Sequence, residues 1–461
     1  MKKILFLLVA TSLIGSAVFA GGTRAGSTQP SSGVPVITDM GWGAVSDDPT
    51  SLEARRRTEY EKAYNVKIDA QSVPYDDYAQ KLITLIAANA LPDLMALEEH
   101  RILEFAAQGV LKDLRVLYAE DGQNIDDVFV EGQMAKTGDN KVYGIGVGGA
   151  LNLLYYNKGL LQKAGITPPP DDVTKPWTWD QYLDALIKLT VDRNGRHPNE
   201  PGFDVNNVVQ WGTAMNDWWI YTLPMLYSAG TSVFTPDGMG LAITKPAGIE
   251  SIQKFSDLKN KYHVSAPEGT FPSNAAALVN DQLATYIDGN YAAGGFVVGE
   301  GDSAVPYDVG MAQIPTQSGK ASNMVWGAAS VLSKNASKEG FAYFKYKQDS
   351  LRIIEDNEQL AQELGFSKPI FYVPVTKNVI NDPALAARLA KFTHPWYTEL
   401  CANIVDRASR VGENITVKNF TQILYEYVQP AIELVITGDA TAAEAFKDLD
   451  AQTRGLFQGV Y

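Results

Sequence analysis

Aromatic and acidic side chains gather in one short stretch of this sequence. Asp217 directly precedes Trp218 and Trp219, and Trp211 and Tyr221 flank them. Flat aromatic faces cover C–H bonds, and carboxylates accept hydrogen bonds from hydroxyl groups. The combination suits a ligand that offers both, such as a polyhydroxylated ring. Because a buried tryptophan removes much apolar area from water, each of these side chains could instead belong to the core.

Motifs for enzymatic chemistry are sparse. None of the four histidines stands in an H-E-x-x-H pattern, and no G-x-S-x-G nucleophile elbow occurs. The chain also has no P-loop, the motif with which many ATP-hydrolysing proteins bind the phosphates. Two acids distant in sequence can still meet in space and cleave a glycosidic bond. A secreted glycoside hydrolase or lyase therefore stays the alternative to a binding protein.

Two further segments resemble ligand motifs without matching them. Gly144, Gly146 and Gly149 have G-x-G-x-x-G spacing, but the sequence after them looks like a strand, where a dinucleotide-binding turn requires a helix. These glycines suit a hinge, because glycine adopts unusual dihedral angles at little cost. The polar segment 192–204 lacks the oxygen spacing and the final glutamate of a calcium loop. The sequence predicts no cofactor and leaves calcium binding by this segment open.

Strands and helices alternate in the first part of the chain. Apolar patterns predict strands over residues 34–40, 66–73 and 91–97, and helical periodicity predicts helices over 51–64 and 75–90. This order predicts an α/β fold with a mainly parallel sheet.

Three candidate site residues directly follow the ends of these strands: Trp42, Glu98 and Glu99. In parallel sheets, ligands lie at the carboxyl ends of the strands, where the loops begin. The alternative is that the two glutamates simply open the next helix, where the helix dipole favours carboxylates.

The most distinctive stretch of the chain is residues 142–190. A glycine-rich crossing leads to an apolar strand ending in Y-Y-N-K at 155–158, then to a short helix, a proline-rich turn and an amphipathic helix. Thr178 and Gln181 form a capping-box pattern at the start of that last helix. This succession resembles the signature of the carbohydrate-type extracellular solute-binding proteins, the receptors of ABC importers, with Gly146 where that family usually has proline.

The resemblance covers almost the whole mature chain. It implies a periplasmic-binding-protein fold of type II, in which two α/β lobes hold a ligand in a cleft between them. Residues 34–147 and 309–370 would form the first lobe, and residues 148–308 and 371–461 the second. A monomer of this kind captures a sugar or oligosaccharide and delivers it to the membrane permease subunits of an importer.

Later segments that match the family add more candidate residues. Asp288 and Tyr291 lie where the family has M-x-[IV]-x-G-x-W, so Tyr291 takes the place of a stacking tryptophan. We expect ligand contacts from Trp42, Glu98, Glu99 and Trp326 in the first lobe and from Asp217, Trp218, Trp219, Asp288 and Tyr291 in the second. Tyr425 and Tyr427 lie on a helix that can border the cleft in relatives.

The chain begins like an exported protein. Two lysines, an uncharged apolar run and small residues before the cleavage point predict a signal peptide over residues 1–20, and hence a periplasmic or other extracytoplasmic location. Residues 21–33 have the composition of a flexible leader. The one cysteine, Cys401, is far from the cleavage point, so the sequence predicts neither a lipid anchor nor an internal disulfide. The net charge of −14 argues against a nucleic-acid partner.

Overall fold

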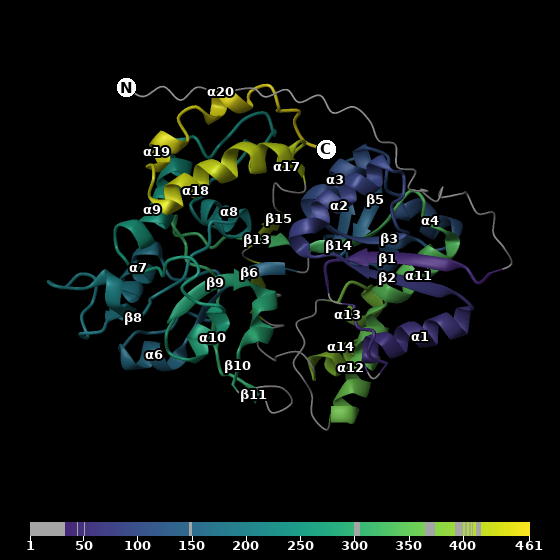
Figure 1. The fold of residues 1–461 in the computed structure, drawn as a ribbon, viewed down its shortest axis with the longest axis horizontal. Helices are drawn as coiled ribbons and strands as arrows, with labels where there is room; N and C mark the ends of the chain where they lie inside the picture. Colours follow the sequence, from purple (N-terminus) through teal and green to yellow (C-terminus); the bar gives the residue numbers. More distant parts are fainter. Residues whose placement is uncertain are drawn as a thin grey trace, which may run out of the picture.

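The computed structural model, shown in Figure 1, describes most of the chain from Gly33 onward. The predicted signal peptide, all but the last residue of the predicted leader, and Gly149 lie outside the described residues. Within the described part, no helix is both long and apolar enough to cross a membrane. The described residues are 33–43, 45–49, 51–146, 150–298, 305–364, 374–391, 400–401, 403–404, 407, 409–411 and 416–461.

The first sheet has six strands in the order β2-β1-β3-β14-β5-β4. Strand β1 pairs in parallel with both β2 and β3, as the alternation of strands and helices predicts. Strand β14, from much later in the chain, returns antiparallel to β3. The strands are β1 (Val36–Gly41), β2 (Lys67–Ser72), β3 (Leu94–Glu98), β4 (Met134–Lys136), β5 (Val142–Ile145) and β14 (Ala328–Leu332).

Four helices cover the two faces of this sheet: α1 (Leu52–Tyr64), α2 (Tyr75–Ala87), α3 (Glu99–Ala107) and α11 (Lys338–Gln348). Ile37 of β1 packs in one apolar cluster with α1 and α11, and Met40 of the same strand packs in another with α2 and α3. The two side chains point to opposite faces because side chains alternate along a strand. The lobe is completed by α4 (Leu114–Glu120), α5 (Ile125–Val128), α12 (Ser350–Leu364), α13 (Lys377–Ile380) and α14 (Pro383–Ala390).

The second sheet is built around β6 (Ala150–Tyr156), a strand whose residues are all buried. Strands β9, β12 and β13 each pair antiparallel with β6, and β15 pairs in parallel with β13. Because β6 is a strand, the glycine motif before it is not the helix-opening turn of a dinucleotide site. The partner strands are β9 (Thr285–Gly289), β12 (Gly310–Ala312), β13 (Asn323–Trp326) and β15 (Ser409–Val411), and two short pairs are β7 (Val191–Asp192) with β8 (Val208–Gln210) and β10 (Val297–Val298) with β11 (Val305–Pro306).

The helices of the second lobe lie left of the first lobe in Figure 1, in teal and yellow. The predicted capping box is confirmed, since Gln181 N donates to Thr178 Oγ1 and Thr178 N donates to Gln181 Oε1. The helices are α6 (Lys158–Lys163), α7 (Trp179–Leu189), α8 (Trp219–Ser228), α9 (Pro246–Asn260), α10 (Asn274–Val279), α17 (Phe420–Ile423), α18 (Gln429–Thr437), α19 (Ala442–Ala445) and α20 (Leu449–Thr453).

The chain returns to the first lobe later than the sequence predicts. Strands β12 and β13 pair with β6, so residues 309–326, Trp326 among them, belong to the second sheet. The crossing falls at Gly327, whose φ of 151° favours glycine, between β13 and β14. This crossing runs beside the glycine-rich one that contains Gly146. A Cβ on Gly146 would lie only 3.4 Å from the carbonyl oxygen of Ala328.

The last crossing also differs from the prediction, which places everything after residue 370 in the second lobe. Helices α13 and α14 pack on α12, and α13 also contacts α5, all in the first lobe. Val379 and Leu389 form a small core there with Ile354. Residues 377–390 therefore extend the first lobe, and the second lobe resumes only after them.

Candidate functional site

A row of aromatic side chains joins the two lobes. Trp42 follows β1 and meets Tyr75, at the start of α2, edge to face with ring centroids 5.8 Å apart. Tyr75 meets Trp218 of the second lobe at 6.1 Å, and Trp218 meets Tyr221 at 6.2 Å. Two further residues, Tyr291 and Trp326, extend this set and are described below. We call all six residues the aromatic row: Trp42, Tyr75, Trp218, Tyr221, Tyr291 and Trp326.

Asp288, at the end of β9, organises the second-lobe part of the aromatic row. Its Oδ1 atom accepts hydrogen bonds from Tyr221 OH at 2.8 Å, from Tyr291 OH at 2.9 Å and from the N–H of Gly289 at 2.7 Å. Burial raises the pKa of the Asp288 carboxyl group, although these hydrogen bonds oppose the rise. A carboxylate held between two tyrosine hydroxyls is well placed to bind further hydroxyl groups.

Tyr291 presents an open aromatic face beside this carboxylate. Its side chain is 52% exposed, and its ring meets Trp326 edge to face at 5.9 Å. Trp326 in turn donates from Nε1 to Oδ1 of Asn152 on β6, which fixes the indole ring. The structure therefore brings Tyr291, Asp288 and Trp326 together, although it assigns Trp326 to the second sheet and not to the first lobe as predicted.

Glu98 is the acidic group of the first lobe at this site. It is the last residue of β3, and it accepts hydrogen bonds from Tyr75 OH and, at 3.0 Å, from Arg101 Nε. Burial alone would raise the pKa of Glu98, but nearby His100, Tyr75 and Arg101 together hold it below its ordinary value. The side chain is therefore a carboxylate at neutral pH, as its predicted role requires.

Sequence reasoning missed two residues of this group, Tyr75 and Arg101. Tyr75 begins α2 just after β2 ends, so the strand-end argument that selected Trp42 applies equally to it. Arg101 lies in the first turn of α3, three residues after Glu98, and this spacing puts the two side chains in reach of each other.

Glu99 opens α3, as the alternative interpretation of the two glutamates expects. It is only 2% exposed, and its backbone N–H donates to the carbonyl of Gly327 at the crossing. Glu99 thus lies under the crossing strand and away from the open surface of the site.

Asp217 has acidic neighbours other than the carboxylates of the aromatic row. Burial raises the pKa of Asp217, and the negative charges of Glu268 and Glu433 raise it further. Its carbonyl oxygen accepts a hydrogen bond from Gln429 on α18. These neighbours differ from those of Asp288, and a ligand contact by Asp217 next to Trp218 stays a prediction.

Trp219 needs a correction, because it is a core residue in this structure. Its side chain is 1% exposed and packs edge to face on Phe420 of α17 at 5.6 Å. Its Nε1 donates to Tyr425 OH at 2.9 Å, so the hydroxyl oxygen of Tyr425 already accepts a hydrogen bond within the protein. No face of the indole is left for a ligand, whereas the neighbouring Trp218 is only partly buried.

The polar loop 192–204 is organised by its own backbone. The buried carboxylate of Asp192 accepts the N–H groups of Asn194, Arg196 and Asp204 at 2.8–3.0 Å. Burial would raise the pKa of Asp192, but these hydrogen bonds lower it. Among the described residues, no group of three or more acidic, histidine or cysteine side chains is placed to hold a metal ion.

His100 lies between the lobes without a hydrogen-bonding partner among the described residues. It belongs to α3 of the first lobe, and its ring packs on three aromatic rings of the second: Trp219, Phe420 and Tyr425, with centroids 5.6, 6.0 and 6.1 Å away. Burial lowers the pKa of His100 to about 4, although Glu98, 3.6 Å away, opposes the shift. This packing therefore requires a neutral imidazole.

Acidification is expected to destabilise the protein through His100. Between about pH 6.5 and 4 the unfolded chain binds a proton at this position that the native state does not, so stability falls as pH falls. From pH 7.5 to 5.5 the loss at this site is about 1.3 kcal/mol. Urea unfolding at both pH values measures it, with His100→Leu as the control that removes the contribution. An equal pH dependence in the variant would contradict the assignment.

Comparison with known proteins identifies related sequences. The sequence profile of a family described as bacterial extracellular solute-binding protein matches residues 44–346. A binding protein of Brucella abortus is 25% identical over 197 residues, so the chain spans only 42% of the length of this relative, and 42% of this chain is covered. The arabinooligosaccharide-binding protein of Bacillus subtilis is 25% identical over 277 residues, 58% of either chain.

Solved structures share the whole architecture. An ABC substrate-binding protein of Listeria monocytogenes, solved in complex with cycloalternan, matches with a TM-score of 0.70 at 20% identity, covering 92% of this chain and 100% of that one. At this identity the likeness concerns the fold alone. It confirms the predicted two-lobed α/β fold.

Proposed function

The chain belongs to the bacterial extracellular solute-binding proteins, and on that premise we propose that it captures a sugar or oligosaccharide for an ABC importer. The observation that carries the proposal is the aromatic row, which runs from one lobe to the other with a carboxylate at each side, Glu98 and Asp288. Aromatic faces stack on the C–H faces of a sugar, and the carboxylates accept hydrogen bonds from its hydroxyl groups.

Contacts from both lobes give the ligand its effect on the protein. A ligand shifts a conformational equilibrium only by the difference between its binding free energies for the two states. A sugar held by Trp42 and Glu98 on one side and by Trp218, Asp288 and Tyr291 on the other is bound fully only when the lobes are closed. The closed form is then the one that the membrane permease receives, and the permease complex supplies the ATP hydrolysis.

The names of relatives support a carbohydrate ligand. One relative is named for arabinooligosaccharides, and the Listeria protein was solved with cycloalternan. The acidic net charge of this chain favours a neutral ligand over an anionic one at the cleft. We propose further that the mature chain, exported by its signal peptide, acts as a monomer outside the cytoplasm and binds the sugar without converting it.

Thermal unfolding of the mature chain, from Gly21 onward, tests this function against a panel of mono- and oligosaccharides. A ligand that binds only the folded state raises the melting temperature in a saturable way. Each sugar that does so is recovered and checked for cleavage. A rise with the sugar intact supports a transport receptor. A rise with cleavage moves the protein to the glycoside hydrolases, and the lack of a rise with every sugar contradicts a carbohydrate ligand.

Tyr291→Ala is expected to weaken sugar binding by about 1–3 kcal/mol, because it removes an open stacking face from the site. The melting temperature without sugar should change little, since the side chain is half exposed. Isothermal titration calorimetry measures the affinity. Tyr291→Phe is the matched control: it keeps the ring and loses only the hydroxyl group that donates to Asp288. Unchanged affinity in Tyr291→Ala would remove this residue from the site.

A further inference from the structure

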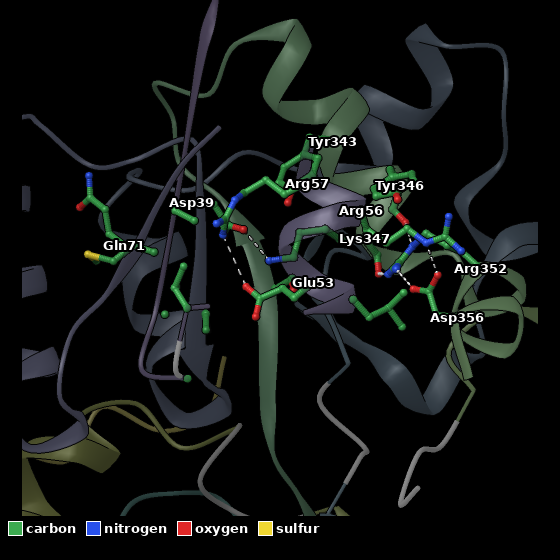
Figure 2. Close-up of a pocket in the computed structure, with 18 residues that line it drawn as sticks. Asp39, Glu53, Arg56, Arg57, Gln71, Tyr343, Tyr346, Lys347, Arg352 and Asp356 are labelled. Carbon is green, nitrogen blue, oxygen red and sulfur yellow. Dashed lines mark hydrogen bonds and ion pairs between the residues drawn. The ribbon is translucent and has the colours of Figure 1, made fainter. Parts of the chain in front are cut away.

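A cavity of about 470 Å³ lies within the first lobe. None of the residues that line it belongs to the aromatic row, although Gly41 and Gly43, on either side of Trp42, do line it. Figure 2 shows it between the first sheet and helices α1, α11 and α12. It lies on the face of the sheet that carries Ile37, whereas Trp42 of the aromatic row packs with the α2 and α3 side. Its volume falls within the range of small-molecule sites.

The sheet leaves room for this cavity because its side chains there are small. Ala96 of β3 pairs with Ser330 of β14, and a Cβ on Gly41 of β1 would lie 3.8 Å from the Cβ of Ala96. Two residues away along the strands, Leu94 and Leu332 form the corresponding pair and fill the core. Gly41 is the last residue of β1, and Ala96 lies two residues before the end of β3. Both are therefore close to the edge of an α/β sheet where ligands bind.

Charged side chains of both signs line another part of the wall. In Figure 2, Asp356 lies between Arg56 and Arg352 and pairs with both of them. On the other side, Lys347 Nζ lies 2.6 Å from Asp39 Oδ2. A ligand in the cavity would therefore meet donors and acceptors that are already held in place.

Arg57 is the group with an unmet hydrogen-bonding capacity. One terminal nitrogen donates to the carbonyl of Ser46 and to the exposed Asp47. The other, Nη1, is buried, forms no hydrogen bond to a described residue, and lies 3.7 Å from the nearest Glu53 oxygen. A buried donor without an acceptor costs free energy, and a guanidinium group matches the geometry of a carboxylate or phosphate.

We propose that this cavity is a second ligand site, which takes a small polyhydroxylated solute carrying a carboxylate or phosphate group. Arg57 Nη1 and Lys347 Nζ bind the oxyanion, and Asp39 and Glu53 accept hydrogen bonds from the hydroxyl groups of the same molecule. The four cations of the wall outnumber its three carboxylates, which favours an anionic over a neutral solute. The site shares no lining residue with the aromatic row of the proposed sugar site, and it goes beyond that function.

Calorimetry of the mature chain with D-gluconate, glycerol 3-phosphate and the neutral sorbitol tests the proposal. We expect saturable binding of at least one of the two anions and no binding of sorbitol. Comparison of the two anions shows whether the site takes a carboxylate or a phosphate. Arg57→Met should weaken that binding at least tenfold, while Tyr291→Ala leaves it unchanged. The lack of binding by both anions, equal binding of sorbitol, or insensitivity to Arg57→Met would overturn the proposal.

A second variant guards against a folding defect. Asp39→Asn combined with Lys347→Met removes the binding ammonium group without leaving its partner as an unpaired charge. It should also weaken anion binding at least tenfold at a melting temperature close to that of the wild type. Full anion binding by this folded variant would overturn the role of Lys347, and loss of binding by Tyr291→Ala would place the anion in the interlobe site instead.

Discussion

Asp288→Ala is expected to lower sugar affinity by about 3 kcal/mol, roughly 100-fold or more. The substitution removes the one atom that holds two tyrosines of the aromatic row, since Tyr221 OH and Tyr291 OH both donate to Asp288 Oδ1. It also removes the carboxylate proposed to accept hydrogen bonds from the ligand. Hydrogen bonds to charged groups contribute about 1.5–3 kcal/mol each, and the freed tyrosine rings must be ordered again on binding. Calorimetry with a sugar identified by the thermal panel measures the change.

Asp288→Asn separates the two parts of this effect. The amide keeps an acceptor oxygen for the tyrosine hydroxyls and loses the charge, so its affinity should lie between those of the wild type and Asp288→Ala. Because burial raises the pKa of Asp288, removing the charge is not expected to destabilise the fold. If both variants bound the sugar as the wild type does, the ligand would lie outside the aromatic row.

Local patterns in the sequence predicted the elements well, because their causes are local. The capping box of Thr178 and Gln181 needs only two residues three positions apart. The order of strands and helices in residues 34–97 follows from the apolar pattern within each segment. The points at which the chain changes lobes depend on distant partners. Strand β12 joins the second sheet because it pairs with β6, more than 150 positions earlier, and nothing in its own few residues encodes that choice.

The candidate site shows the same limit. The strand-end argument selected Trp42 and Glu98, which the structure places beside each other through Tyr75. The clustering of aromatic residues that selected Trp218 and Trp219 could not separate the two. The two are adjacent and of the same type, and only the position of α17, about 200 residues later, decides which indole is enclosed. Burial of a side chain by a distant helix is a tertiary property that composition and spacing do not contain.

Trp219→Ala is expected to destabilise the folded state by about 3–5 kcal/mol, the cost of replacing a fully buried tryptophan by alanine. The cavity that it leaves borders Phe420 and His100, and Tyr425 OH loses the Trp219 Nε1 donor. Urea unfolding measures the loss. At temperatures where the variant is still folded, its sugar affinity should remain close to that of the wild type.

Trp218→Ala is the matched control, because the two indoles are neighbours in sequence with different surroundings. Trp218 is partly exposed and contacts Tyr75 and Tyr221 of the aromatic row. Its removal should lower sugar affinity by about 1–3 kcal/mol and stability by less than the loss in Trp219→Ala. The reverse outcome, with affinity lost in Trp219→Ala at full stability, would mean that Trp219 leaves the core on ligand binding. The contact of α3 with α17 would then have to open, and His100 would be exposed with it.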